Sequence, residues 1–143
     1  MPEFELVAGP FSFTEGPVWD GKQVIFTDIP PSRIMAFDPA TGACEVLIEG
    51  SEKSNGLAQD ADGRIYACQD EGRRVVRYEA DGTRTTIAET FEGARLNSPN
   101  DLSIDTEGRI WFSDPRDGPE RDDMELDHRR TCASAAPRAE TCM

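Results

Sequence analysis

A segment of forty-odd residues occurs three times in this chain, and the repetition constrains the fold more than any other feature. The copies begin at Glu15, Asn55 and Asn100, so they start 40 and then 45 residues apart. In each copy a polar residue is followed by a short apolar run, a glycine-containing turn and a second apolar run. A fixed period of about 20 to 50 residues is typical of solenoids, propellers and other repeat folds.

Within each period, short apolar or alternating runs are separated by dipeptides that favour hairpin turns. These dipeptides are Asp20-Gly21, Thr41-Gly42, Asp62-Gly63, Asp81-Gly82 and Glu107-Gly108. No sustained helical period is present. We expect strands in the first unit near residues 18–19, 23–27, 34–37 and 44–48, and in the second near 57–59, 64–69, 75–78 and 83–88. Four short antiparallel strands per period predict an all-β chain that folds as a β-propeller.

The third unit loses its strand pattern after its second apolar run. We therefore predict that residues 1–118 form two and a half to three propeller blades and that residues 119–143 form a divergent, disordered tail. A propeller ring has about 4 to 8 blades, so this arc is incomplete. An open arc leaves exposed strand edges, through which the chain could self-associate.

The recurring carboxylates Asp20, Asp60 and Asp105 stand before or within the glycine turns. Hairpin geometry explains their repetition, because Asp is favoured in such turns. We therefore assign them a structural role.

Composition excludes two classes of partner. The chain has 28 acidic and 15 basic residues and a formal net charge of −13. Nucleic-acid binding depends chiefly on Lys and Arg, and an anionic membrane surface attracts the same residues. No run is long and apolar enough to span a membrane and the start of the sequence lacks a secretory leader, so we expect a cytoplasmic protein.

The equivalent positions Glu15, Asn55 and Asn100 are the candidate ligands of a metal ion. Each precedes the innermost strand of its unit, and such positions meet at one end of a propeller channel. Carboxylate and amide oxygens suit Ca²⁺, with Mg²⁺ or Mn²⁺ as alternatives. These side chains could instead bond the backbone of the preceding turn. Both interpretations stay open for Glu15 and Asn100, and the turn interpretation is preferred for Asn55.

Four longer motifs make the sequence resemble the gluconolactonase family, which includes the senescence marker protein regucalcin. The motifs are Phe13-Thr14-Glu15-Gly16-Pro17-Val18-Trp19, Phe26-Thr27-Asp28-Ile29-Pro30, Ala94-Arg95-Leu96-Asn97-Ser98-Pro99-Asn100-Asp101-Leu102 and Ile110-Trp111-Phe112-Ser113-Asp114-Pro115. The resemblance extends from about Phe11 to about His128. It implies a six-bladed propeller that hydrolyses sugar lactones such as gluconolactone, with Ca²⁺ or another divalent cation such as Mg²⁺, Mn²⁺ or Zn²⁺ in its channel.

The resemblance also implies roles for three residues. Glu15 matches the first metal ligand of the family. Asn100 matches an Asn that lies beside the metal and contacts substrate, or ligates the ion in related lactonases. Arg95 falls near a substrate-binding Arg of some members, although the spacing differs here.

The remaining residues of the family's site are expected in later blades. They are an Asn and an Asp that ligate the metal, and the Asp is also the general base, so we assign no catalytic residue to this chain. We hypothesise a frameshift or truncation near Arg129 and expect the isolated chain to bind Ca²⁺ poorly and to have little lactonase activity. The alternative function is a non-catalytic propeller fragment that self-associates or binds a partner.

Overall fold

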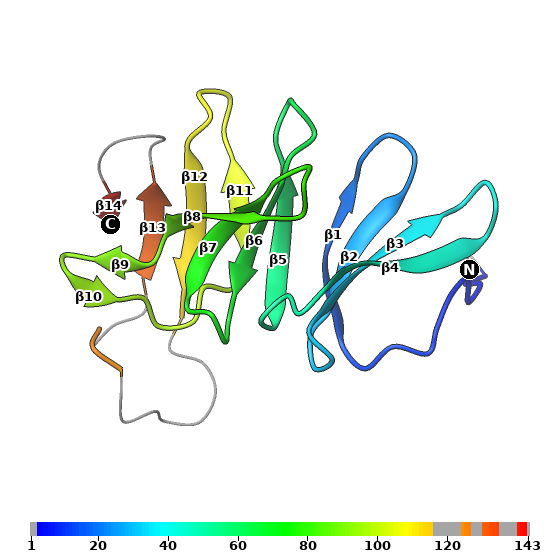
Figure 1. Ribbon diagram of the computed structural model, residues 1–143, viewed down its shortest axis with the longest axis horizontal. Helices are drawn as coiled ribbons and strands as arrows, with labels where there is room; N and C mark the ends of the chain where they lie inside the picture. Colours follow the sequence, from blue (N-terminus) through cyan, green and yellow to red (C-terminus); the bar gives the residue numbers. More distant parts are fainter. Residues whose placement is uncertain (1–2, 116–123, 127–129, 135–139, 143) are drawn as a thin grey trace.

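The computed structural model describes residues 3–115, 124–126, 130–134 and 140–142, the last two segments by their backbone alone. Every regular element in these residues is a β-strand, and the strands form three four-stranded sheets and a two-stranded hairpin. Figure 1 shows the three sheets standing side by side in an arc. No helix in the described residues is long and apolar enough to cross a membrane. The all-β propeller architecture predicted from the repeats is confirmed.

The first and second sheets are antiparallel meanders in which spatial order follows chain order. The first contains β1 (Thr14–Trp19), β2 (Val24–Asp28), β3 (Arg33–Asp38) and β4 (Ala43–Glu49). The second contains β5 (Ser54–Gln59), β6 (Ile65–Gln69), β7 (Arg74–Tyr78) and β8 (Arg84–Ala88). These strands lie where the apolar runs predict them, except that β1 and β5 begin three or four residues earlier.

A bulge explains the early start of the innermost strands. The pairing of β1 with β2 shifts between Glu15 and Val18, and the pairing of β5 with β6 shifts between Ser54 and Leu57. A bulge inserts an extra residue and breaks the alternation of apolar and polar side chains. The residues before each bulge therefore do not look like strand in the sequence.

The third sheet has four strands, one pair more than the sequence pattern predicts. It contains β11 (Leu102–Ile104), β12 (Ile110–Asp114), β13 (Arg130–Ser134) and β14 (Glu140–Cys142), and β13 pairs with β12 from Ile110↔Ser134 to Asp114↔Arg130. An outer strand is held mainly by backbone hydrogen bonds, and its side chains do not have to alternate between apolar and polar. Such a strand is therefore hard to predict from its sequence. The arc thus has three blades, and the other residues of the 119–143 segment, 124–126 apart, lie outside the described part.

Apolar side chains pack between neighbouring sheets. Ile25, Ile34 and Ala36 of the first sheet lie in one cluster with Leu57 and Val76 of the second. A second cluster joins the other side of the second sheet to the third, through Tyr66, Cys68, Val75, Leu102, Ile110 and Phe112. A hairpin of β9 (Thr90–Phe91) and β10 (Ala94–Arg95) connects these two sheets, and Phe91 belongs to the second cluster.

The recurring hairpin carboxylates have the structural role predicted for them. Asp60 Oδ1 accepts hydrogen bonds from the N–H groups of Asp62 and Arg64, and its Oδ2 accepts from the Arg64 guanidinium and the Tyr66 hydroxyl. Asp105 repeats the arrangement one blade later, with Trp111 Nε1 as the aromatic donor. These bonds from Trp111 and Arg109 hold the pKa of Asp105 well below its usual range.

Candidate functional site

The three candidate ligands meet at one hollow. Glu15, Asn55 and Asn100 all line a cavity of about 370 Å³ at the starts of the innermost strands β1, β5 and β11. Glu15 pairs with Thr27 just before the bulge in β1, and Asn55 follows Ser54, which pairs with Gln69 just before the bulge in β5. The N–H of Asn100 donates a hydrogen bond to the backbone oxygen of Ser113, near the end of β12. The repeat alignment therefore predicted the convergence of these residues.

Two glycines allow the innermost strands to approach each other at this hollow. A Cβ atom on Gly16 would lie 2.6 Å from the backbone oxygen of Asn55, and one on Gly56 would lie 2.8 Å from that of Asn100. Real Cβ atoms do not come this close to backbone atoms. Gly16 also has a φ of 55°, in the left-handed region that favours glycine.

Backbone hydrogen bonds join the three strands around the hollow. The buried Thr27 hydroxyl lies 3.0 Å from the backbone oxygens of both Glu15 and Asn55, so it links the first sheet to the second. The Gly56 N–H donates a 2.7 Å hydrogen bond to the Asn100 oxygen and links the second sheet to the third. These bonds fix the positions from which the three side chains project.

Two buried carboxylates hold the loops that lead into the site. Asp28, at the end of β2, accepts hydrogen bonds from the N–H groups of Ser12 and Phe13, two residues before Glu15. Asp114, at the end of β12, accepts from the N–H groups of Asn97 and Ser98, two residues before Asn100. Asp28 and Asp114 therefore position the candidate ligands from corresponding places in two blades.

Asp28 also pairs with Arg33, whose guanidinium donates two hydrogen bonds to its Oδ2. Burial alone would raise the pKa of Asp28. The N–H groups of Phe13 and Ser12 and the Arg33 guanidinium outweigh this effect and lower the pKa. Asp28 is therefore a charged structural group at neutral pH.

The side chains of the three candidate ligands are not used by the turns. In the described part of the chain, the hydrogen bonds of Glu15, Asn55 and Asn100 involve their backbone groups, and their carboxylate and amide groups donate or accept none from a neighbouring turn. The turn interpretation, which the sequence leaves open for Glu15 and Asn100 and favours for Asn55, gains no support from these bonds. Their role as ligands stays a prediction.

Asp101 adds a second carboxylate to the lining, and the sequence reasoning missed it. Its Oδ1 accepts a hydrogen bond from the N–H of Leu102. The repeat alignment could have identified Asp101, because it occupies the position equivalent to Gly16 and Gly56. With Glu15 and Asp101 present and no Lys, Arg or His in the lining, the hollow is acidic. Among the described residues no three Asp, Glu, His or Cys side chains cluster as a metal centre, so amide oxygens have to complete any ligand set.

Arg95 lies outside the lining of the hollow. It belongs to β10, where its backbone N–H donates to a Glu125 carboxylate oxygen and its guanidinium donates to the Gly72 oxygen. The contact of Arg95 with substrate, which the resemblance implies despite the different spacing of this residue, stays a prediction.

Sequence comparison identifies the family of this chain. The conserved region described as SMP-30/Gluconolactonase/LRE-like matches residues 13–138. The chain belongs to this family. The matched segment continues ten residues beyond His128, near which the resemblance noted in the sequence ends.

Two curated relatives of this chain are named as lactonases. A gluconolactonase from Zymomonas mobilis is 30% identical over 127 residues, which cover 78% of this chain and 35% of the relative. A pentonolactonase from Haloferax volcanii is 38% identical over 105 residues, which cover 68% of this chain and 32% of the relative. The chain thus spans about a third of the length of these relatives.

Solved structures show the same arc. A gluconolactonase from Xanthomonas campestris superposes with a TM-score of 0.88 at 29% identity, covering 96% of this chain and 49% of that structure. A streptogramin B lyase, with a TM-score of 0.66 at 17% identity, shares the fold alone. This chain therefore corresponds to about half of a gluconolactonase propeller.

Proposed function

We propose that this chain forms part of the site of a sugar-lactone hydrolase that depends on a divalent cation. One observation carries the proposal: Glu15, Asn55 and Asn100 project from three blades into one acidic hollow. Family membership supports the reaction class, since relatives of this chain are named gluconolactonase and pentonolactonase. Ring opening of a lactone is the hydrolysis of an internal ester.

The residues of the hollow fit a hard cation. Two carboxylates and two amide groups line it, and oxygen ligands of this kind suit Ca²⁺, Mg²⁺ or Mn²⁺ better than softer metals. We assign the carboxylate of Glu15 and the amide oxygen of Asn100 to the ion, with Asn55 and Asp101 as further oxygen donors. A bound dication polarises the lactone carbonyl and lowers the pKa of water.

The other function of this chain at the site is to orient substrate. The amide of Asn100 presents both a donor and an acceptor, so it can bind a sugar hydroxyl beside the ion. Phe13 lines the same hollow and is 57% exposed, so its ring offers an apolar surface to the carbon face of a sugar ring. We assign no general base to this chain and expect little turnover from it alone.

Calcium titration followed by ¹⁵N NMR tests this proposal. We expect Ca²⁺ to shift the amide signals of residues 15–17, 55–57 and 100–101, with an affinity of roughly millimolar because few charged ligands are present. Glu15→Gln should weaken binding by about tenfold or more. The matched control is Glu45→Gln, which alters an exposed carboxylate on the outer strand of the same sheet.

Two results would overturn the assignment. One is equal Ca²⁺ affinity in wild type and Glu15→Gln, and the other is an equal loss in Glu15→Gln and Glu45→Gln. Gluconolactone hydrolysis, measured by pH-stat against the spontaneous rate, tests the expectation of low turnover. Turnover that disappears with chelator and with Glu15→Gln would show that this chain carries a complete site.

A further inference from the structure

The two ends of the arc present sheet faces rather than new strand edges. The front face of the first sheet is formed by Trp19, Val24, Phe26, Phe37 and Val46, which cross-strand pairing places on one side. The opposite side of this sheet, with Ile25, Ile34 and Ala36, packs against the second sheet. At the other end, the back face of the third sheet is formed by Ser103, Trp111 and Ser113.

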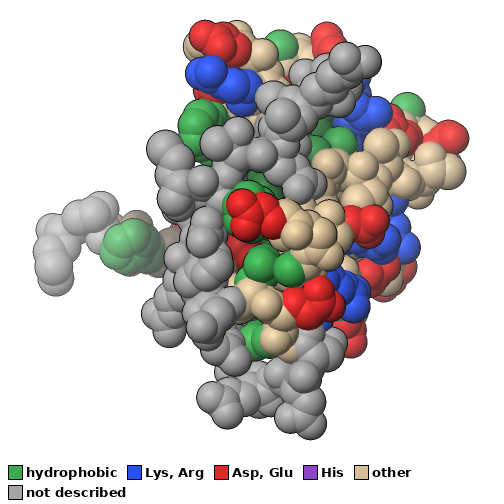
Figure 2. Space-filling model, turned by 90° about the vertical axis from the view of Figure 1, so that its left-hand side faces the viewer, with side chains coloured by type: hydrophobic (Ala, Val, Ile, Leu, Met, Phe, Trp, Pro, Cys, Tyr) green, Lys and Arg blue, Asp and Glu red, His purple; other side chains and the backbone are tan. Residues whose placement is uncertain are grey.

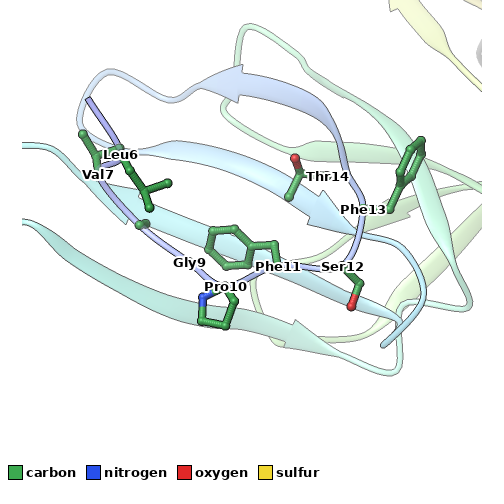
Figure 3. A pocket seen from close by; sticks show the side chains of 9 residues that line it. Leu6, Val7, Gly9, Pro10, Phe11, Ser12, Phe13 and Thr14 are labelled. Atoms are coloured by element: carbon green, nitrogen blue, oxygen red, sulfur yellow. The ribbon is translucent and has the colours of Figure 1, made fainter. Parts of the chain in front are cut away.

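The front face is apolar and partly open. A groove of about 460 Å³ runs along it, lined by Val24, Phe26 and Phe37 and by Leu6 and Phe11 of the N-terminal segment. Figure 3 shows this segment running along the sheet, with Phe11 over its strands. Trp19 stays 55% exposed and Leu6 90% exposed. Exposed apolar surface of this kind marks an interaction site.

The other two sheets indicate which kind of surface could pack on the front face of the first sheet. Pro17, Val24 and Phe26 are equivalent in register to Leu57, Ile65 and Ala67, through which the second sheet contacts the first. Leu102, Ile110 and Phe112 form the corresponding contact of the third sheet with the second. The front faces of the second and third sheets therefore each pack on the back face of the preceding sheet.

The back face of the third sheet has the matching geometry. Ser103, Trp111 and Ser113 are the register equivalents of Ala58, Tyr66 and Cys68 in the second sheet, and Tyr66 and Cys68 pack against the third sheet. Ser103 is exposed, and Trp111 and Ser113 are half-buried. Figure 2 views the molecule from the left-hand side of Figure 1, and the described side chains visible there include acidic, basic and apolar ones.

The length of the arc decides how many copies close a ring. Three sheets cover 49% of a gluconolactonase structure, so each spans about a sixth of a turn and three span half a turn. A head-to-tail contact forms a closed ring only when its rotation completes a full turn. With half a turn per copy, two copies suffice.

We propose that two copies of this chain close a propeller ring, each placing the front face of its first sheet on the back face of the partner's third sheet. Closure covers both open faces at once and leaves the outer strands β4 and β8 in solvent. It also brings the partner's Glu15, Asn55 and Asn100 to the same end of the channel. This last consequence rests on the proposed function, whereas the ring itself does not.

Charge gives the assembly a distinctive salt dependence. Each copy carries a net charge of −13, so two copies repel one another. Salt screens this repulsion while leaving apolar contacts intact. The dimer should therefore strengthen as ionic strength rises, the opposite of an assembly held by ion pairs.

Sedimentation velocity over a wide concentration range, at low and high salt and in chelator, tests the proposal. We expect a species of twice 15.8 kDa that is favoured by salt. Trp19→Asp on the front face and Ser103→Arg on the back face should each raise the dimer dissociation constant by about tenfold or more, because each buries an uncompensated charge. Phe4→Asp, at an aromatic residue that is 94% exposed outside the groove lining, is the matched control and should dimerise normally.

Mixing the two variants distinguishes head-to-tail closure from other dimers. A ring of one Trp19→Asp copy and one Ser103→Arg copy has one interface that carries both substitutions and one that carries neither. We therefore expect the mixture to form more dimer than either variant alone. Circular dichroism melting checks that each variant is folded.

Several outcomes would overturn the proposal. A monomer under all conditions would show that the two faces do not bind a second copy of this chain. A dimer that Ser103→Arg leaves intact, or variants whose mixture forms no additional dimer, would indicate front-to-front association. Larger open assemblies would show that two copies do not close. A dimer that binds no Ca²⁺ would support the ring and contradict the proposed function instead.

Discussion

The backbone N–H of Gly56 donates a 2.7 Å hydrogen bond to the backbone oxygen of Asn100 and joins the second sheet to the third at the candidate site. This bond requires the two backbone segments to lie closer than any side chain on residue 56 permits. A Cβ atom there would lie 2.5 Å from Asp101 Oδ1 and 2.7 Å from Asp101 Cα. The glycine therefore determines how tightly the blades converge around the hollow.

Gly56→Ala should destabilise the chain and disturb the hollow. The added methyl group has to push the strand of Asp101 away, and overpacking of this kind costs about 3 kcal/mol. Urea unfolding measures the loss. Gly82→Ala is the control, because Gly82 has a φ of 83° and open space around it, so only the cost of left-handed backbone, about 1 kcal/mol, applies. Equal losses in the two variants would contradict the steric argument.

Thr27→Val should weaken the contact between the first and second sheets. Valine has nearly the same shape, but it leaves the partly buried backbone oxygens of Glu15 and Asn55 without the buried hydroxyl that lies 3.0 Å from both. Unsatisfied buried acceptors cost about 1 to 3 kcal/mol, which urea unfolding resolves. Thr85→Val provides the comparison: Thr85 is exposed and its hydroxyl bonds to Glu79, so water can replace the lost partner and the change should be small.

Asp28→Asn should cost about 3 kcal/mol at neutral pH, because it removes the charged partner of Arg33 and weakens the acceptor of the Ser12 and Phe13 N–H groups. The pKa of Asp28 is lowered in the folded chain. Its stabilising contribution is therefore present above the ordinary Asp pKa and is lost as pH falls through the lower folded value. The difference in unfolding free energy between wild type and Asp28→Asn should shrink in acid.

Chemical denaturation at a series of pH values measures that difference. Asp20→Asn is the control, since Asp20 is an exposed hairpin residue whose Oδ1 accepts only from the Lys22 and Gln23 N–H groups. A difference for Asp28→Asn that stays constant down to low pH would show that the bond geometry, and not the charge, is what matters.

Sequence reasoning predicted the parts of this fold that the repeat makes visible. The hairpin dipeptides and apolar runs identified eight strands in the first two blades, and the alignment of Glu15, Asn55 and Asn100 predicted their convergence. The repeat carries this information because equivalent residues in successive blades occupy equivalent positions around one channel. The same alignment contained Asp101, which was overlooked because its equivalents are glycines.

Other features left no readable pattern. The bulges within β1 and β5 interrupt the alternation of apolar and polar side chains, and β13 pairs through backbone groups that most sequences can provide. The roles of Asp28 and Asp114 depend on hydrogen bonds to residues sixteen or seventeen positions away, such as Ser12 and Asn97. Contacts of that range become visible only once the strands are paired.

Cys68 should resist thiol reagents while the chain is folded. Burial raises the pKa of its thiol well above the ordinary value, and the nearby carboxylates of Asp101 and Asp114 raise it further. The reactive thiolate is therefore scarce. Iodoacetamide labelling followed by peptide mass spectrometry should modify the half-buried Cys44 before Cys68, and Cys68 only in urea. Rapid labelling of Cys68 without denaturant would show that the second and third sheets separate readily.

Calcium and ring closure should stabilise each other, if the two proposals above both hold. A ring of two copies offers the ion the partner's Glu15 and amides as well, so the dimer should bind Ca²⁺ more tightly than the monomer. Linkage then requires Ca²⁺ to lower the dimer dissociation constant by a corresponding factor. Sedimentation equilibrium with Ca²⁺ and with chelator measures this shift, and Trp19→Asp should weaken Ca²⁺ binding in the NMR titration although it lies outside the hollow lining.

Charge screening by Ca²⁺ has to be separated from binding at the hollow. In Glu15→Gln, Ca²⁺ should promote the dimer no more than sodium chloride of equal ionic strength, because the ligand carboxylate is gone while the net charge of the chain changes by only one. A Ca²⁺ effect of the same size in wild type and Glu15→Gln would show that screening alone drives it, and the ion would then have no part in closing the ring.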